Sequence, residues 1–143
     1  MDEAILDANI LLRYLTDEPR TMADRVAAIL ERAEEQHVAL VVAPLTLAEV
    51  IYVLESVYTW PRTDVANGLL QLISASVLTF LEAPTVVQSL TWYRDRAGLD
   101  FADAYVAALA VERGHGIVIS FDRDLRRLSG IQVVQDAADI DRD

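Results

Sequence analysis

Four acidic residues that lie far apart in the chain could take part in catalysis or bind a metal ion: Asp7, Glu49, Asp103 and Asp122. Asp7 interrupts the apolar run AILDANILL, and Asp122 directly follows the run IVISF. Burying a carboxylate without a partner is costly, so such residues are normally paired or bound to a metal. Oxygen ligands without cysteine or a nearby histidine favour hard divalent ions such as Mg²⁺ or Mn²⁺.

The elements that must position these acids alternate along the chain. Apolar runs predict strands over residues 4–7, 38–42, 77–81, 117–121 and 131–134. Helical periodicity or capping patterns predict helices starting at Asn9, over 21–36, from 44 or 46 to 54 or 58, and over 63–73, 85–96, 100–112 and 123–128. We therefore expect an α/β fold and a single domain over residues 1–143, with a central parallel sheet of four to five strands covered by helices on both faces.

Such a sheet would bring the four acids together, because ligands bind at the carboxyl ends of parallel strands, where helices begin. Carboxylates that meet there raise one another's pKa unless a cation lies among them. A carboxylate-held Mg²⁺ activates water and neutralises phosphoryl oxygens, and two ions about 4 Å apart are usual for phosphodiester hydrolysis. Asn9 is placed to hold Asp7 or a metal-bound water.

Each acid taken alone also has a purely structural explanation. Glu49 would complete a capping box that begins at Thr46. Asp100 could cap a helix whose first turn contains Asp103, and Asp122 could cap the helix that follows it, with Asp124 in its first turn. The histidines, His37 and His115, are expected in exposed loops.

Composition limits the function further. The net charge of −11 argues against a broad basic surface for nucleic acid. All twelve basic residues are arginines, whose planar fork grips phosphate. Arg13 and Arg123 are candidate contacts for substrate phosphates, with Arg126 and Arg127 close by, although exposed arginines are as often simply solvated. The acidic N-terminus, Met-Asp-Glu, and the lack of cysteine favour a cytoplasmic protein with no membrane segment.

Four segments resemble the acidic motifs of PIN-domain ribonucleases, and most of all those of VapC-type toxins from toxin–antitoxin pairs. The segments are ILDANILLRYL, PLTLAEVIYVL, GLDFADAYVAALA and VISFDRDLRRL. They occur in the family's order over nearly the whole chain. The resemblance implies a PIN-like domain and an Mg²⁺- or Mn²⁺-dependent endoribonuclease. It also implies an RNA substrate, inhibition by a cognate antitoxin, and a homodimer.

By this resemblance Asp7, Glu49, Asp103 and Asp122 match the acidic quartet that holds the metal. Asn9 matches the polar residue after the first acid, and Ser120 the small hydroxyl residue before the fourth. Asp100 either caps its helix or joins the surroundings of the metal. We expect an antitoxin to insert an Arg- or Lys-bearing segment into the acidic pocket.

Two other functions remain open. In the first, the protein is a non-catalytic interaction module whose acids only cap helices. A phosphoryl-transfer protein, such as a receiver domain or an aspartyl phosphatase, is disfavoured because the chain has no lysine and because Asn9 stands where the phosphatase signature has a second aspartate. Trp92, Tyr93 and Tyr105 could stack on bases. For Trp92 and Tyr93, core packing or a subunit contact is the simpler explanation.

Overall fold

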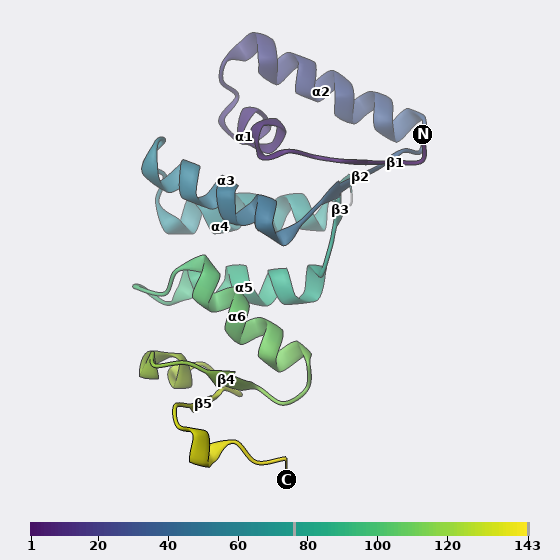
Figure 1. The fold of residues 1–143 in the computed structure, drawn as a ribbon. Helices are drawn as coiled ribbons and strands as arrows, with labels where there is room; N and C mark the ends of the chain where they lie inside the picture. The colour runs from purple at the N-terminus through teal and green to yellow at the C-terminus, as the bar shows by residue number, and fades with distance from the viewer. Residues whose placement is uncertain (76, 143) are drawn as a thin grey trace. The chain divides into compact units, whose positions relative to one another are not determined.

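The structure, a computed structural model, describes residues 1–75 and 77–142. The chain forms two compact units, Met1–Ala83 and Pro84–Asp143 (Figure 1). The sequence predicts a single domain over residues 1–143, and that remains a prediction. The α/β class, with strands that pair in parallel, is confirmed.

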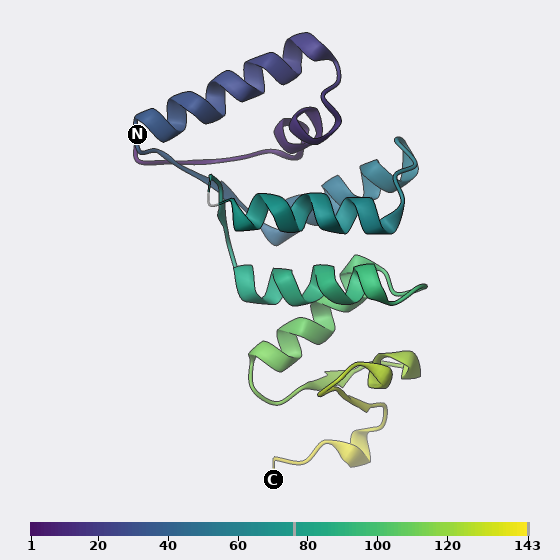
Figure 2. The same cartoon turned by 180° about the vertical axis from the view of Figure 1, so that it is seen from behind.

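The first unit contains a three-stranded parallel sheet in the order β1-β2-β3. Its strands are β1 (Glu3–Ile5), β2 (Ala39–Val42) and β3 (Thr79–Phe80). Its helices are α1 (Ala8–Thr16), α2 (Arg20–Glu35), α3 (Pro44–Ser56) and α4 (Arg62–Ser74). Helix α1 packs against both α2 and α3, and α3 lies alongside α4, as both views show (Figures 1 and 2).

Apolar side chains spaced for a helix form the core of this unit. Leu47, Val50 and Leu54 of α3 are fully buried, and so is Val65 of α4. In α2 the predicted stripe is only partly buried, because Val26, Leu30 and Ala33 are buried while Ile29 is 44% exposed. The helical period therefore predicted the inward face of α2 correctly except at Ile29, which lines an open pocket.

The second unit contains a two-stranded parallel sheet, β4 (Ile117–Ile119) and β5 (Gln132–Val134). Helix α5 (Ala83–Asp95) begins at the boundary between the units, and α6 (Phe101–Glu112) packs against β4. Two short 3-10 helices complete it, η1 (Arg123–Arg127) between the strands and η2 (Ala137–Asp139) after β5.

In the described residues the five strands pair as three and two rather than as one central sheet of four to five. Each strand is where the apolar runs predicted it, although most are shorter than the runs. An apolar run predicts a strand but neither ensures its burial, since Ile5 and Ile119 are exposed, nor specifies its hydrogen-bonded neighbour, and that is why the grouping was not predicted.

Candidate active site

Asp7 lies between β1 and α1, at the residue before the helix begins. Its side chain does not cap the helix; instead, Oδ2 accepts a hydrogen bond of 3.1 Å from Asn9 Nδ2. The prediction that Asn9 holds Asp7 is therefore confirmed. The Asp7 carboxylate is exposed. With the helix capped by no side chain, this carboxylate remains available for a ligand.

Glu49 lies in the second turn of α3, and its side chain is exposed. The predicted capping box from Thr46 to Glu49 is wrong. The helix already begins at Pro44, whose missing N–H suits the first helical position, so Thr46 lies inside the helix. Among the described residues the Glu49 carboxylate makes no hydrogen bond or ion pair. Helix capping therefore does not explain why an acid stands at position 49.

In the second unit, Asp100 and Asp103 fix the start of α6. Asp100 is the N-cap, and its Oδ1 accepts a 2.9 Å hydrogen bond from the backbone N–H of Asp103. The side chain of Asp103 is half-buried. Burial, the negative charges of Asp100 and Asp122, and a hydrogen bond with Asp100 all raise the pKa of Asp103 above its ordinary value. Negative charge from Asp100 and Asp122 thus accumulates around Asp103.

Asp122 follows β4 after a short turn that two polar residues hold in place. The Oγ of Ser120 accepts the backbone N–H of Asp122 at 3.0 Å. One oxygen of Asp122 accepts the backbone N–H of Asp124 at 2.9 Å, so Asp122 caps η1 as its structural explanation predicted. The cap occupies Oδ1 and leaves Oδ2 for another partner.

Asp103 and Asp122 line one pocket of about 350 Å³ within the second unit. Asp95 and Asp124 line it too, together with two arginines, Arg96 and Arg127. Arg127 lies 3.7 Å from Asp124, whereas the guanidinium of Arg96 makes no hydrogen bond or ion pair with the residues described. Sequence reasoning missed Arg96. Its signal was a basic residue two positions before Gly98, the first residue of the motif GLDFADAY.

The other singled-out residues have mixed outcomes. Arg123 donates a 3.2 Å hydrogen bond to Gln135 Oε1, and Arg13 lines a separate pocket in the first unit. Trp92 and Tyr93 are buried, which confirms core packing. Tyr105 is half-buried with its ring 6.3 Å from that of Phe101. The two histidines are exposed in turns, as predicted.

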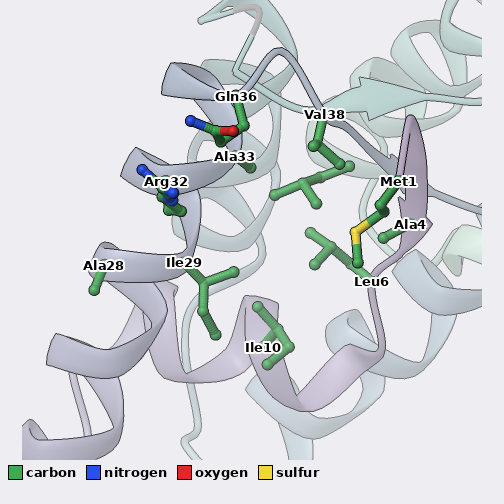
Figure 3. Close-up of a pocket in the computed structure, with 11 residues that line it drawn as sticks. Met1, Ala4, Leu6, Ile10, Ala28, Ile29, Arg32, Ala33, Gln36 and Val38 are labelled. Atoms are coloured by element: carbon green, nitrogen blue, oxygen red, sulfur yellow. The ribbon is translucent and has the colours of Figure 1, made fainter.

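A larger pocket, of about 750 Å³, lies in the first unit between the β1–β2 strands and α2 (Figure 3). Its walls are mainly apolar and include Leu6, Ile10 and Ile29. The one charged side chain that lines it, Arg32, lies 3.4 Å from the carboxylate of Glu35. This pocket therefore offers shape but no reactive group, and the acidic pocket is the better candidate for catalysis.

Within either unit, the described residues contain no group of three or more Asp, Glu or His side chains arranged to hold a metal ion. The first unit contains Asp7 and Glu49, and the second contains Asp103 and Asp122. Each unit thus supplies two members of the predicted quartet. None of the helices in residues 1–75 and 77–142 is both long and apolar enough to span a bilayer.

Comparison with known proteins identifies the family. The PIN domain matches residues 4–131, which is most of the chain. This chain belongs to the PIN-domain family. Over 124 residues it is also 24% identical to the VapC ribonuclease of Aquifex aeolicus (strain VF5), covering 87% of this chain and 90% of that protein. No solved structure gives a significant match. The resemblance to VapC-type PIN proteins seen in the four motifs is confirmed.

Proposed function

We propose that this PIN-domain protein is a divalent-metal-dependent endoribonuclease and the toxin of a toxin–antitoxin pair. The observation that carries the proposal is the acidic pocket, in which burial and the negative charges of Asp100 and Asp122 raise the pKa of Asp103. The VapC ribonuclease similar to this chain supports the nuclease activity. The toxin role follows the family resemblance of the four motifs.

The residues available fit Mg²⁺ or Mn²⁺. Burial and the negative charges of Asp100 and Asp122 raise the pKa of Asp103, and a cation beside these carboxylates would remove their mutual repulsion. The chain has no cysteine and both histidines are exposed in turns, so the donors are all oxygens, as hard cations prefer. Asp7, Glu49, Asp103 and Asp122 would hold the ion, and Asn9, Asp100 and Ser120 would support them.

The chain's own residues then have separate tasks. Asn9 orients the Asp7 carboxylate, Ser120 fixes the backbone at Asp122, and Asp100 fixes the first turn that carries Asp103. Arg96 and Arg127, on the same pocket, bind phosphate oxygens of the RNA and offset the acidic surface. Arg123 is held by Gln135 and can contact a phosphate only with its remaining donors.

Hydrolysis adds a water oxygen to the scissile phosphorus and breaks one ester P–O bond, and a proton from water goes to the leaving oxygen. A bound Mg²⁺ or Mn²⁺ supplies the Lewis acidity that lowers the pKa of that water and neutralises charge on the phosphoryl oxygens. The four carboxylates position this chemistry, and the arginines hold the strand against them. Removing one carboxylate should therefore abolish cleavage without unfolding the protein.

The partners follow from the same pocket. A cognate antitoxin would place an Arg or Lys side chain among the carboxylates, where negative charge is concentrated. We also propose that the toxin is a homodimer and acts in the cytoplasm. A complex in which the partner contacts only residues away from the acidic pocket would contradict this mode of inhibition.

Expression with and without the neighbouring small open reading frame, followed by mapping of new RNA 5′ ends, tests the proposal. The parent chain should arrest growth and generate new ends, and Asp7→Asn should do neither. Glu31→Gln, which removes an exposed acid from α2, is the matched control and should behave like the parent. Purified protein should cleave RNA with Mg²⁺ or Mn²⁺ and stop in EDTA.

Asp100 and Asp122 do cap helices, which favours the non-catalytic interaction module as the second candidate. The same experiment separates the two. If the parent and Asp7→Asn give the same RNA ends and the same growth, the protein is not the nuclease proposed here.

A further inference from the structure

A second, smaller pocket lies between α1 and α2 in the first unit, with a volume of about 230 Å³. Two arginines line it, Arg13 from α1 and Arg25 from α2. The remaining lining residues are one amide and four apolar side chains: Asn9, Ile10, Met22, Val26 and Ile29. No carboxylate lines this pocket, although the chain carries 23 Asp and Glu residues against 12 arginines.

Neither arginine has an ionic partner among the described residues; Arg13 is half-buried and Arg25 is exposed. The Nε of Arg13 is buried without a hydrogen-bond partner among the described residues, and Nη1 reaches only the Glu18 carbonyl oxygen at 3.4 Å. Arg25 makes no hydrogen bond or ion pair with any described residue. A buried N–H donor without a hydrogen-bond partner lowers stability. The unsatisfied Nε of Arg13 therefore suggests that a bound ligand provides the acceptor.

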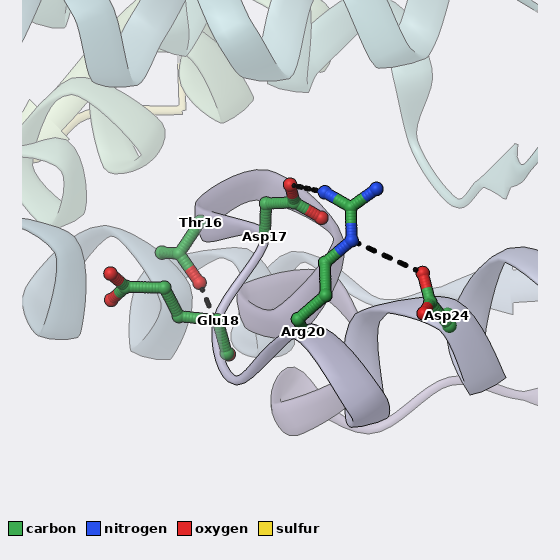
Figure 4. Close-up of polar contacts among 5 residues, drawn as sticks. All are labelled: Thr16, Asp17, Glu18, Arg20 and Asp24. Carbon is green, nitrogen blue, oxygen red and sulfur yellow. Dashed lines mark hydrogen bonds and ion pairs between the residues drawn. The ribbon is translucent and has the colours of Figure 1, made fainter.

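A nearby arginine on the same helix shows the contrast. Arg20 bonds the carboxylate of Asp17 and lies 3.4 Å from that of Asp24 (Figure 4). Its charge is thus already compensated within the chain. The positive charge of Arg13 and Arg25 is not compensated in this way, and a planar guanidinium fork matches the oxygens of a phosphate.

Asn9 links this pocket to the proposed metal ligand Asp7. Asn9 lines it and at the same time donates to Asp7, one of the proposed metal ligands. A strand whose scissile phosphate lies at Asp7 would therefore pass this pocket with a neighbouring nucleotide. The side chains of Ile10 and Met22 beside the arginines suit the sugar or base of that nucleotide.

We propose that Arg13 and Arg25 form a phosphate subsite that holds the RNA backbone next to the cleaved bond. This inference rests on the proposed ribonuclease function. It adds a binding role for α2, a helix that contributes no residue to the predicted acidic quartet. The ligand is a phosphate within a single strand of RNA rather than a free phosphate ion.

Direct binding tests the subsite independently of cleavage. Fluorescence anisotropy would measure the affinity of full-length Asp103→Asn, which is expected not to cleave, for a fluorescein-labelled single-stranded RNA between about 50 and 200 mM salt. Over this range each phosphate contact on a single strand should weaken the affinity by about 2.6-fold. Adding Arg25→Ala should weaken binding about tenfold at the lowest salt. It should also reduce the slope of log affinity against log salt by about 0.7, the value for one phosphate on a single strand.

Arg20→Ala in the same background is the matched control, because it removes the same charge from α2 where carboxylates already compensate it. Arg13→Lys, which keeps the charge but loses the fork, should weaken binding less than Arg25→Ala and leave the slope nearly unchanged. Inorganic phosphate at the same ionic strength as chloride should not displace the RNA.

The outcomes separate the two proposals. If Arg25→Ala and Arg20→Ala have equal affinities and slopes, or if the Asp103→Asn chain does not bind RNA, the subsite is wrong. If inorganic phosphate displaces the RNA, the pocket binds free phosphate and the subsite is again wrong. If RNA binds through Arg25 but the parent chain never cleaves it with Mg²⁺ or Mn²⁺, the nuclease proposal fails while the subsite stands.

Discussion

Asp100 is the residue whose substitution separates a structural from a metal-binding role most cleanly. Its Oδ1 accepts the backbone N–H of Asp103 at 2.9 Å and thereby caps α6. Its charge also contributes to the raised pKa of Asp103. Asp100→Ala removes both the cap and the charge, whereas Asp100→Ser keeps a cap of similar quality and removes only the charge.

The cap sets the size of the expected effect. Loss of an N-cap acceptor costs about 1 kcal/mol, so Asp100→Ala should lower the free energy of unfolding by that amount. For a chain of this length, it corresponds to a fall in Tm of about 3–5 °C. Asp100→Ser should match the parent or exceed it slightly, since it keeps the hydrogen bond and relieves the repulsion of Asp103.

Urea unfolding followed by far-UV circular dichroism at pH 7 in EDTA would measure both variants. The two should differ by about 1 kcal/mol, with Asp100→Ala the less stable. If Asp100→Ser loses as much stability as Asp100→Ala, the cap is not what Asp100 provides. If Asp100→Ser also loses Mn²⁺ affinity as severely as Asp103→Asn, Asp100 is itself a ligand.

Three further perturbations give measurable outcomes. Between pH 3.8, the ordinary pKa of Asp103, and its raised native value, the folded state binds the proton more tightly than the unfolded chain, so unfolding free energy falls as pH rises through that window. Asp103→Asn should therefore be more stable than the parent at pH 7 in EDTA, with the difference vanishing below pH 3.8; a less stable variant at pH 7 would contradict the sign. Leu54→Ala, at a fully buried position of α3, should cost about 3 kcal/mol in urea unfolding, and a cost below about 1 kcal/mol would mean that Leu54 is not core. Gly116→Ala should cost about 2 kcal/mol or more, because φ is +66° and the new Cβ would lie 1.9 Å from the Gly130 carbonyl oxygen; wild-type stability would refute that geometry.

The positions of helices and strands could be predicted from apolar runs and helical periodicity, although the apolar residues of β4 are not all buried: Ile117 and Ile119 are exposed. The apolar run at 117–121 became β4, and the periodic segment at 100–112 became α6. Asp100 and Asp122 cap helices at the predicted residues, since both stand directly before the first helical turn. The association of Asn9 with Asp7 followed from their separation of two residues.

The helix start at Pro44, the pairing of strands and the residues that line each pocket could not be predicted from the spacing of residues along the chain. The capping box at Glu49 failed because Pro44 starts its helix two residues before Thr46. The pairing of strands and the position of Arg96 on the acidic pocket depend on which segments meet in space, and a residue's neighbours in sequence do not reveal that. Arg13 is predicted to contact a phosphate because it follows Asp7 by six residues, and this stays a prediction; Arg25, which lines the same pocket, comes from another helix.

The proposed nuclease requires a divalent ion that Asp7 and Asp103 help to hold. Isothermal titration of Mn²⁺ into the parent chain, Asp7→Asn and Asp103→Asn tests it most directly. Each variant should lose about tenfold or more in Mn²⁺ affinity, because removing even a residue that supports a ligand costs that much. Parent-like Mn²⁺ binding by Asp7→Asn, or by Asp103→Asn, would contradict the claim.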